Sequence, residues 1–446
     1  FIVITMIVSS RLIVPLVLYL CWCNRVVLSQ EDGSLESFKN IGELISYYSK
    51  SYDLEGLNRQ LSALFEETQR NIQPSKRKRA PLSAFNDGGS GYELTTRHKL
   101  AHDLEQFEYL RNYPGIGFTP NTARVLKEEI PKDYHAILDL FENGTIQSDA
   151  FYRFKPGDPV LDWYNRALFV PQMDAKLKSD EQYGNKLEVP LLNPANDFAQ
   201  LERQWFGEDP NHPDPGIVVV DNLLSPEALK KVRELLLLST FWYESKSPET
   251  AGRYVGAYIG DGLHQKLILA IAYDLHKAMP RVMEGHPLKF MWAYKYESDV
   301  LANDDGGDND NSTRVEESTG VLTHADDAAV NVNIWITPDE ANLDPDSGGL
   351  VVFKTKPPED WSFREYNAQA EYVEEHLLKP SGFANVTVPY KQNRAVIFDS
   401  LLFHRTDQHR FKPGYENRRI NLTILYGNHG RNNDKKQKKK KANDEL

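Results

Sequence analysis

Cysteine is nearly absent from this chain of 446 residues, which contains two, Cys21 and Cys23. Both fall in an N-terminal segment that we expect to be removed, so the mature protein would contain no disulfide. A chain of this length can bury a large core and does not need covalent cross-links. Its stability must therefore come from packing.

An excess of positive charge is also missing. The formal net charge is -12, and the last sixteen residues contain seven Lys or Arg against three Asp or Glu, so the rest of the chain is more acidic still. Proteins that bind nucleic-acid backbones do so through basic surfaces that release condensed counterions. The composition therefore disfavours nucleic acid as a partner.

The longest N-terminal apolar run is short. Residues 12–23 are apolar, whereas crossing a bilayer takes roughly twenty residues. The preceding Arg11, this run and the small or β-branched residues at 27–29 are typical of a signal peptide, which we expect to cover residues 1–30. If the apolar stretch is counted from Phe1, an uncleaved membrane anchor is the alternative.

The C-terminal end predicts a compartment. Residues 443–446 read Asn-Asp-Glu-Leu, which is similar to the retrieval signal of the endoplasmic reticulum. Together with a signal peptide, this favours the secretory pathway and the lumen of the endoplasmic reticulum. The basic clusters at 76–79 and 438–441 leave nuclear localisation open. We expect residues 429–446 to form a basic disordered tail.

Helical periodicity dominates the first part of the chain. Apolar residues recur every three or four positions within residues 35–71, 97–113 and 122–141. Residues 73–92 combine Pro, basic residues and Gly-Gly-Ser-Gly, which is typical of a linker. We therefore expect residues 31–200 to form a mostly helical accessory region.

Two histidines in this region have helical metal-ligand spacing. His98 and His102 are four residues apart, so they share one helix face. No carboxylate or cysteine partner is grouped with them in the sequence, and we interpret them as surface histidines.

The pattern changes after a Pro-, Asn- and Asp-rich boundary at residues 193–215. Residues 216–220 predict a short strand, and Ser225 followed by Pro226 predicts the start of a helix. Within residues 289–427, short strands alternate with turns, as in a barrel or jelly roll. The expected fold class is therefore α+β, with helices first and strands later.

Three residues have the types and the strand phase of a metal site. His324 and Asp326 are two positions apart, so on a strand both side chains point to one face. Residues 394–404 are expected to form a buried β run that ends in His404, which would bring a third ligand from a distant strand. Two imidazoles and a carboxylate on one face of an iron leave positions open for other ligands. Chemically eligible alternatives nearby are Asp327, Asp407 and His409.

A buried arginine is expected on a later strand. Arg419 begins an alternating run, so its side chain should share a face with Asn421 and Thr423. A guanidinium inside a barrel is costly unless it is paired, and a dicarboxylate would provide a bidentate partner. Arg418, on the opposite face, is the competing candidate.

The strand expected at residues 330–336 also has a polar face. Asn331, Asn333 and Trp335 alternate with apolar residues. Amides suit a polar pocket better than they suit an apolar interface. We therefore expect the face with Asn331 and Asn333 to line the cavity.

In this order, His324-x-Asp326, Gly348-Gly349, His404 and Arg419 resemble the Fe(II)/2-oxoglutarate-dependent oxygenase superfamily. The Gly-Gly turn resembles that of the prolyl-4-hydroxylase-like branch, and residues 419–423 are similar to the cosubstrate-binding strand of the alkylation-repair branch. The resemblance covers residues 216–427. It implies a double-stranded β-helix, of jelly-roll or cupin-like form with flanking helices, as an oxygenase domain at residues 212–428.

The resemblance also implies cofactors and residue roles. Fe(II) would be bound by His324, Asp326 and His404, with 2-oxoglutarate and O₂ in the remaining positions and ascorbate as an optional reductant. Arg419 would anchor 2-oxoglutarate. The further cofactor-binding candidates are Tyr296, which resembles the tyrosine that precedes the motif in relatives, and Asn331, Asn333 and Thr423.

The implied reaction hydroxylates a C–H bond and forms succinate and CO₂. The leading hypothesis is a polypeptide substrate, with prolyl residues as the first case to consider. A small molecule or lipid substrate and a catalytically idle jelly-roll binding module are the alternatives. The acidic segment at residues 303–311 departs from relatives and is interpreted as either a lid near the iron or an insertion.

Overall fold

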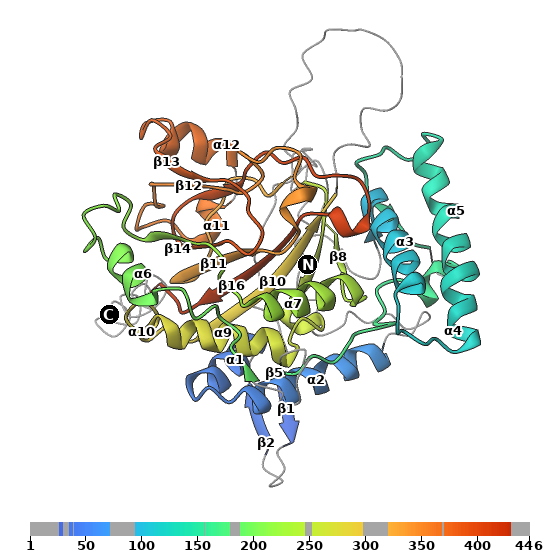
Figure 1. Cartoon of the computed structure of the whole chain (residues 1–446). Helices are drawn as coiled ribbons and strands as arrows, with labels where there is room; N and C mark the ends of the chain where they lie inside the picture. Colours follow the sequence, from blue (N-terminus) through green and yellow to red (C-terminus); the bar gives the residue numbers. More distant parts are fainter. Residues whose placement is uncertain are drawn as a thin grey trace, which may run out of the picture.

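The computed structural model (Figure 1) describes residues 26–29, 35–38, 40–71, 94–155, 157–178, 188–245, 252–297, 320–367 and 370–429. The expected linker, both basic clusters, the acidic segment, the tail after residue 429 and all but four residues of the expected signal peptide lie outside these residues. Among the described helices, none combines the length and the apolar composition needed to cross a bilayer.

Two antiparallel sheets form the strand-rich part of the chain. The larger has seven strands in the order β7-β14-β11-β16-β10-β9-β8, and the smaller has the order β13-β12-β15. The large sheet consists of β7 (Ile217–Val220), β8 (Glu244–Ser245), β9 (Tyr254–Tyr258), β10 (Leu288–Tyr296), β11 (Val330–Trp335), β14 (Ala395–Asp399) and β16 (Ile420–Tyr426). The small sheet consists of β12 (Leu350–Phe353), β13 (Asn385–Val388) and β15 (His404–Thr406). The chain is thus α+β with a large antiparallel sheet.

Strand β11 shows why the large sheet has two different faces. Val332 and Ile334 belong to the main hydrophobic cluster beneath the sheet. Their neighbours Asn333 and Trp335 point to the opposite face, where Trp335 packs with residues of the small sheet. Alternation along the strand therefore separates an apolar face, covered by helices, from an inner face that lies toward the small sheet.

Helices cover the apolar face of the large sheet (Figure 1). They are α1 (Ile41–Lys50), α2 (Leu54–Asn71), α7 (Pro226–Leu238) and α9 (Lys266–Ala278). Leu44 and Leu61 are buried in the same cluster as Leu269 of α9 and Met291 of β10. Helix α7 starts as predicted, because the Ser225 hydroxyl accepts the backbone N–H of Ala228 and Pro226 occupies the first turn.

A second helical group packs beside the sheet around its own cluster. It comprises α3 (Arg97–Asn112), α4 (Pro120–Arg124), the π-helical turn η1 (Val125–Glu129) and α5 (Ile130–Glu142). Leu110 and Tyr134 are fully buried in this cluster. In Figure 1 these helices stand together at one side of the molecule.

Two expectations about this part of the chain were wrong. His98 and His102 are buried rather than exposed, because α3 packs them against the sheet and its flanking loops. Burial lowers the pKa of His98 to about 3. The hydrogen bond between its ring and the carbonyl of Tyr254 acts to raise this pKa, but its effect is smaller than that of burial. Residues 35–38 form strand β2 (Leu35–Phe38), paired with β1 (Val26–Ser29), where we expected helix.

The remaining described elements are short and lie in the connections. They are β3 (Leu94–Thr95), β4 (Tyr152–Arg153), η2 (Pro159–Asp162), β5 (Leu177–Lys178), β6 (Glu188–Val189), α6 (Phe198–Trp205), η3 (Ile259–Asp261), α10 (Pro280–Met283), η5 (Asp339–Ala341), α11 (Phe363–Tyr366), α12 (Ala370–Val373), η6 (Glu374–Leu378) and η7 (Tyr415–Asn417). The segment from α11 to η6 joins two strands of the small sheet and adjoins the candidate site.

Candidate metal centre

The two predicted histidines, His324 and His404, lie next to each other in the structure. His324 and His404 form an isolated antiparallel bridge in which each backbone N–H donates to the carbonyl of the other, at 3.0 and 2.8 Å. Their imidazole centroids are 4.2 Å apart. Asp326 follows His324 by two residues and brings its carboxylate to the same face. One ligand atom from each of the three residues lies within 4.8 Å of the others. Among the described residues, this is the one cluster of three or more such groups that fits a metal ion.

Backbone carbonyls fix the orientation of both imidazoles. The Nδ1 of His324 lies 2.7 Å from the carbonyl of Leu322, and the Nδ1 of His404 lies 2.9 Å from that of Leu402. Because a carbonyl can only accept, each Nδ1 carries the proton and donates it. In the neutral ring this leaves the lone pair on Nε2, as a metal-binding imidazole needs.

The carboxylate of Asp326 faces these two lone pairs. Its oxygens lie 3.9 Å from Nε2 of His324 and 3.5 Å from Nε2 of His404. Electron pairs that face one another at such distances repel unless a proton or a metal cation lies between them. The arrangement of donors therefore fits a bound cation.

The pKa of His324 supports a neutral imidazole. Burial lowers this pKa to about 4, and the neighbouring His404 adds to the effect. For Asp326, burial acts to raise the pKa, but the adjacent imidazoles of His404 and His324 and the ammonium group of Lys289 hold it below its ordinary value. Near neutral pH the site thus presents a neutral imidazole and an ionised carboxylate.

A chain of buried amides extends from Asp326 across the inner face of the large sheet. Asn331 donates to Oδ2 of Asp326 at 2.7 Å, Asn333 donates to Asn331 at 2.7 Å, and Asn421 donates to Asn333 at 2.8 Å. Thr423 also donates to Asn333, at 3.0 Å. Because a carboxylate can only accept, Asp326 sets the direction of every amide in the chain.

Strand register places Arg419 and Tyr296 opposite each other at the end of this face. The backbone N–H of Tyr296 donates to the carbonyl of Arg419, and the guanidinium lies 4.7 Å from the Tyr296 ring. Arg419 donates to the carbonyls of Gly348 and Gly349 at 2.8 and 3.1 Å. A side chain at Gly349 would collide with the backbone of Val388, which explains the glycine of the predicted turn.

Arg418 has a different environment from its neighbour. It makes two hydrogen bonds to the carboxylate of Glu105 on α3, at 2.7 and 3.0 Å. Its side chain is buried at the junction of the helical group and the sheet. The structure therefore places Arg419 in the pocket and Arg418 outside it, in agreement with their opposite strand phases.

The residues that surround the candidate metal centre form a small cavity of about 30 Å³. This is roughly one water molecule's share of liquid volume. The cavity is lined by Trp292, Tyr294, Tyr296, Val321, His324, Asp326, Asn333, Leu350, His404, Thr406, Arg419, Asn421 and Thr423. Three of its buried polar atoms have no hydrogen-bond partner: Oδ1 of Asp326, Nη1 of Arg419 and Oδ1 of Asn421. Unpaired buried polar groups cost stability, and three of them in one cavity fit a bound polar ligand.

Most predicted site residues thus lie together, but two details differ. Asn331 acts behind Asp326 rather than in the cavity lining, and Trp335 stacks on Tyr390, with centroids 5.4 Å apart. The three eligible alternatives do not join the metal cluster: Asp327 pairs with Lys289, the carboxylate of Asp407 accepts from Ser347, and His409 lies near Asp407.

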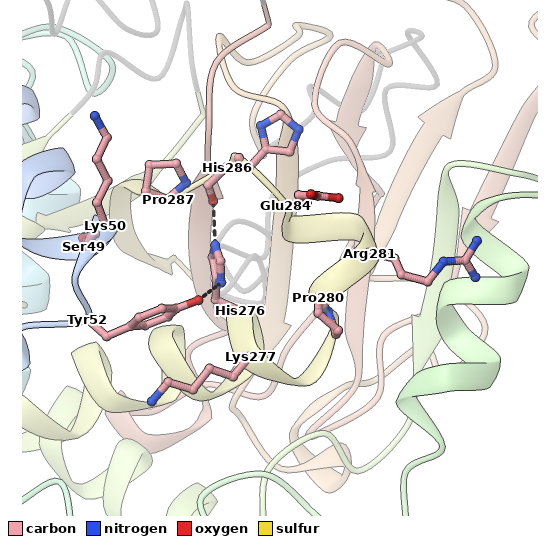
Figure 2. Close-up of a pocket in the computed structure, with 11 residues that line it drawn as sticks. Ser49, Lys50, Tyr52, His276, Lys277, Pro280, Arg281, Glu284, His286 and Pro287 are labelled. Atoms are coloured by element: carbon pink, nitrogen blue, oxygen red, sulfur yellow. Dashed lines mark hydrogen bonds between the residues drawn. The ribbon is translucent and has the colours of Figure 1, made fainter.

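A larger hollow of about 660 Å³ lies elsewhere, between α1, α9 and α10 (Figure 2). Tyr52 donates to Nδ1 of His276 at 2.8 Å, and Nε2 of His276 donates to the carbonyl of His286 at 3.0 Å. The cationic groups of Lys50, Lys277 and Arg281 point away from one another. Lys50 and Lys277 lie in the last turns of α1 and α9, where a cation complements the helix dipole, and Arg281 pairs with the carboxylate of Glu208. Helix ends and an ion pair thus account for the basic residues of this hollow.

Two contacts at the metal centre were missed by sequence reasoning. Lys289 lies beside Asp327 and contributes to the low pKa of Asp326. Asn367 binds the backbone of Ala325. Neither lies in a motif or near the triad in sequence, so no local signal would have identified them.

No family model matches the chain, and no curated protein does. Solved structures do match part of the chain. The epimerase SnoN, in complex with Fe3+, alpha ketoglutarate and nogalamycin RO, is 13% identical, with 52% of this chain and 85% of SnoN covered and a TM-score of 0.33. An oxidoreductase of the 2OG-Fe(II) oxygenase family from Burkholderia pseudomallei is 10% identical over 53% and 92% of the two chains, with a TM-score of 0.31. A prolyl-4-hydroxylase from Pseudomonas putida is 12% identical over 52% and 100%, also with a TM-score of 0.31. At these identities and TM-scores, the function has to be inferred from the residues of this chain.

Proposed function

We propose that this protein is an Fe(II)- and 2-oxoglutarate-dependent oxygenase. One observation carries the proposal: two imidazoles and a carboxylate converge in a buried cavity that also contains the guanidinium of Arg419. Two His and one carboxylate form the facial set of non-haem Fe(II) oxygenases and leave positions open for other ligands. A buried cation beyond them suits a cosubstrate with a carboxylate at its far end.

The partnerless atoms of the cavity support both ligands. Oδ1 of Asp326 points into the metal cluster, while Oδ2 is held by Asn331. Nη1 of Arg419 is without a hydrogen-bond partner, whereas the other two guanidinium nitrogens each donate to a backbone carbonyl. An idle binding module has no reason to bury these unpaired groups in one cavity, since each one costs stability.

When bound, Fe(II) with 2-oxoglutarate would supply the oxidising chemistry, which forms succinate and CO₂. His324, Asp326 and His404 would hold the metal, and the carbonyls behind the imidazoles would keep Nε2 directed at it. Arg419 would bind and orient the distal carboxylate, with Tyr296 and Thr423 beside it. The buried aromatic wall would exclude water, which strengthens the charge interactions inside the site. A five-carbon diacid fits only if some of this wall moves.

We further propose that the two sheets are those of a double-stranded β-helix of the prolyl-4-hydroxylase-like branch. The support is the order of motifs in the sequence together with the Gly348-Gly349 turn, whose carbonyls accept from Arg419. On this basis the substrate is a polypeptide, with prolyl residues as the first candidates.

Succinate formation tests the proposal. Purified protein loaded with Fe(II) should form succinate from 2-oxoglutarate under O₂ without a substrate, and a panel of proline-rich peptides should raise the rate. A rate that responds to no peptide but rises with small molecules or lipids would redirect the substrate assignment. Absence of succinate from metal-loaded protein would favour the binding module.

A further inference from the structure

On one side, the backbone between the two ligands of the His324-x-Asp326 motif pairs with no strand among the described residues. His324 and Asp326 direct their backbone groups toward the chain at residues 400–404, where the N–H of Asp326 donates to the carbonyl of Ser400 at 3.0 Å. In an extended segment, the N–H and C=O of the intervening residue point the other way. Ala325 is fully buried, so water does not reach these groups. They need a partner from another part of the chain.

The side chain of Asn367 supplies both hydrogen bonds. Its Oδ1 accepts the backbone N–H of Ala325 at 3.0 Å, and its Nδ2 donates to the carbonyl of Ala325 at 2.8 Å. An amide side chain carries one acceptor and a donor in one plane, like the edge of a peptide group. Asn367 therefore takes the place of a neighbouring strand at the residue that separates two of the metal ligands.

A second contact from the same segment supports this arrangement. The hydroxyl of Thr323 donates to the carboxylate of Glu374 in η6 at 2.6 Å. Thr323 and Ala325 alternate with His324 and Asp326, so they face away from the metal cluster. The segment from α11 to η6 thus holds the motif from behind at two successive outward-facing positions.

We infer that Asn367 is a positioning residue for the metal, an inference that rests on the proposed metal site. It fixes the backbone between His324 and Asp326 and thereby sets the spacing of the imidazole and the carboxylate. Its amide contacts the backbone of Ala325, and Asn367 belongs neither to the metal cluster nor to the lining of the cavity. Groups that orient metal ligands typically change metal affinity about 10- to 100-fold when they are removed.

Metal titration of two variants and one control tests this inference. Asn367→Ala removes both hydrogen bonds, whereas Asn367→Asp keeps the shape and the acceptor but replaces the donor by an oxygen that repels the carbonyl of Ala325. Co(II) and anaerobic Fe(II) should bind both variants about 10- to 100-fold more weakly than the native protein, measured by calorimetry and by Co(II) absorption. Ser362→Ala is the matched control, because it removes the N-cap of α11 and leaves the Asn367 amide in place.

The outcomes separate the inference from the proposed function. Weak metal binding in both Asn367 variants, with native affinity in Ser362→Ala, supports positioning. Equal losses in all three would show that the segment acts only through stability, and native affinity in Asn367→Asp would overturn the inference directly. If the native protein binds neither metal, the proposed metal site itself fails.

Discussion

His324 and His404 exchange both backbone hydrogen bonds, and the same pairing brings their imidazoles within 4.2 Å, centroid to centroid. The contact between the two strands is thus also the framework of the metal site. Ligand geometry and fold stability are coupled here, because a residue that disturbs the pairing moves both rings.

Arg419 should be required for binding of the cosubstrate. Arg419→Ala removes the guanidinium of the cavity, so 2-oxoglutarate should bind Co(II)-loaded protein at least about 30-fold more weakly, as when one partner of a buried charge pair is truncated. Metal affinity without cosubstrate should stay native. Calorimetry measures the affinity for 2-oxoglutarate. A native affinity in Arg419→Ala would show that Arg419 does not belong to the cosubstrate site.

Glu105 should matter for stability rather than for cosubstrate. Its removal in Glu105→Ala leaves the buried guanidinium of Arg418 without its carboxylate. Removing one partner of a fully buried pair costs about 3–5 kcal/mol, and we expect about 2 kcal/mol because Glu105 is partly exposed. Chemical denaturation measures this loss. An unchanged free energy of unfolding, or a loss of 2-oxoglutarate affinity at conditions where the variant is folded, would contradict the assignment.

The amide chain should stabilise the inner face of the sheet. Asn333→Leu deprives Asn331, Asn421 and Thr423 of their shared partner in a buried region. Each buried polar group left unpaired costs about 1–3 kcal/mol, so a total loss of about 2–4 kcal/mol is expected after partial relaxation. The exposed strand residue Asn385 is the control, and Asn385→Leu should change the free energy of unfolding by less than about 0.5 kcal/mol. Similar changes in the free energy of unfolding for both variants would show that the amide chain does not stabilise the sheet.

Buried neutral histidines should make the protein sensitive to acid. The pKa of His98 is lowered to about 3 and that of His324 to about 4, in both cases chiefly by burial. Between pH 6.5 and these values the unfolded state binds protons that the folded state does not. The free energy of unfolding should therefore fall with decreasing pH, by up to about 1.4 kcal/mol per unit for each such histidine.

Denaturation of the apoprotein between pH 6.5 and 4 measures this slope. His98→Gln should make the slope shallower. His135→Gln, at an exposed histidine, is the matched control for this substitution. A slope that is insensitive to His98→Gln would show that this imidazole is protonated within the fold.

Strand phase explains how much of the site could be predicted from the sequence. His324 and Asp326 share a face because they are two positions apart, and the same rule separates Arg419 from Arg418. The burial of His98 was not predictable, because it depends on α3 packing against a sheet more than a hundred residues away in sequence. Asn367 was not predictable either: it resembles every other asparagine of the chain until folding brings it to Ala325. Local periodicity determines the direction of a side chain, whereas its partner depends on tertiary contacts.

Metal binding is the most direct test of the account. Anaerobic titration of the native protein with Fe(II) should show one site per chain. 2-Oxoglutarate should bind with full affinity only when the metal is already bound. His324→Ala and His404→Ala should each abolish this site, whereas His409→Ala, which removes another buried imidazole outside the cluster, should keep it. One Fe(II) bound with native affinity by His324→Ala or His404→Ala would contradict the central claim.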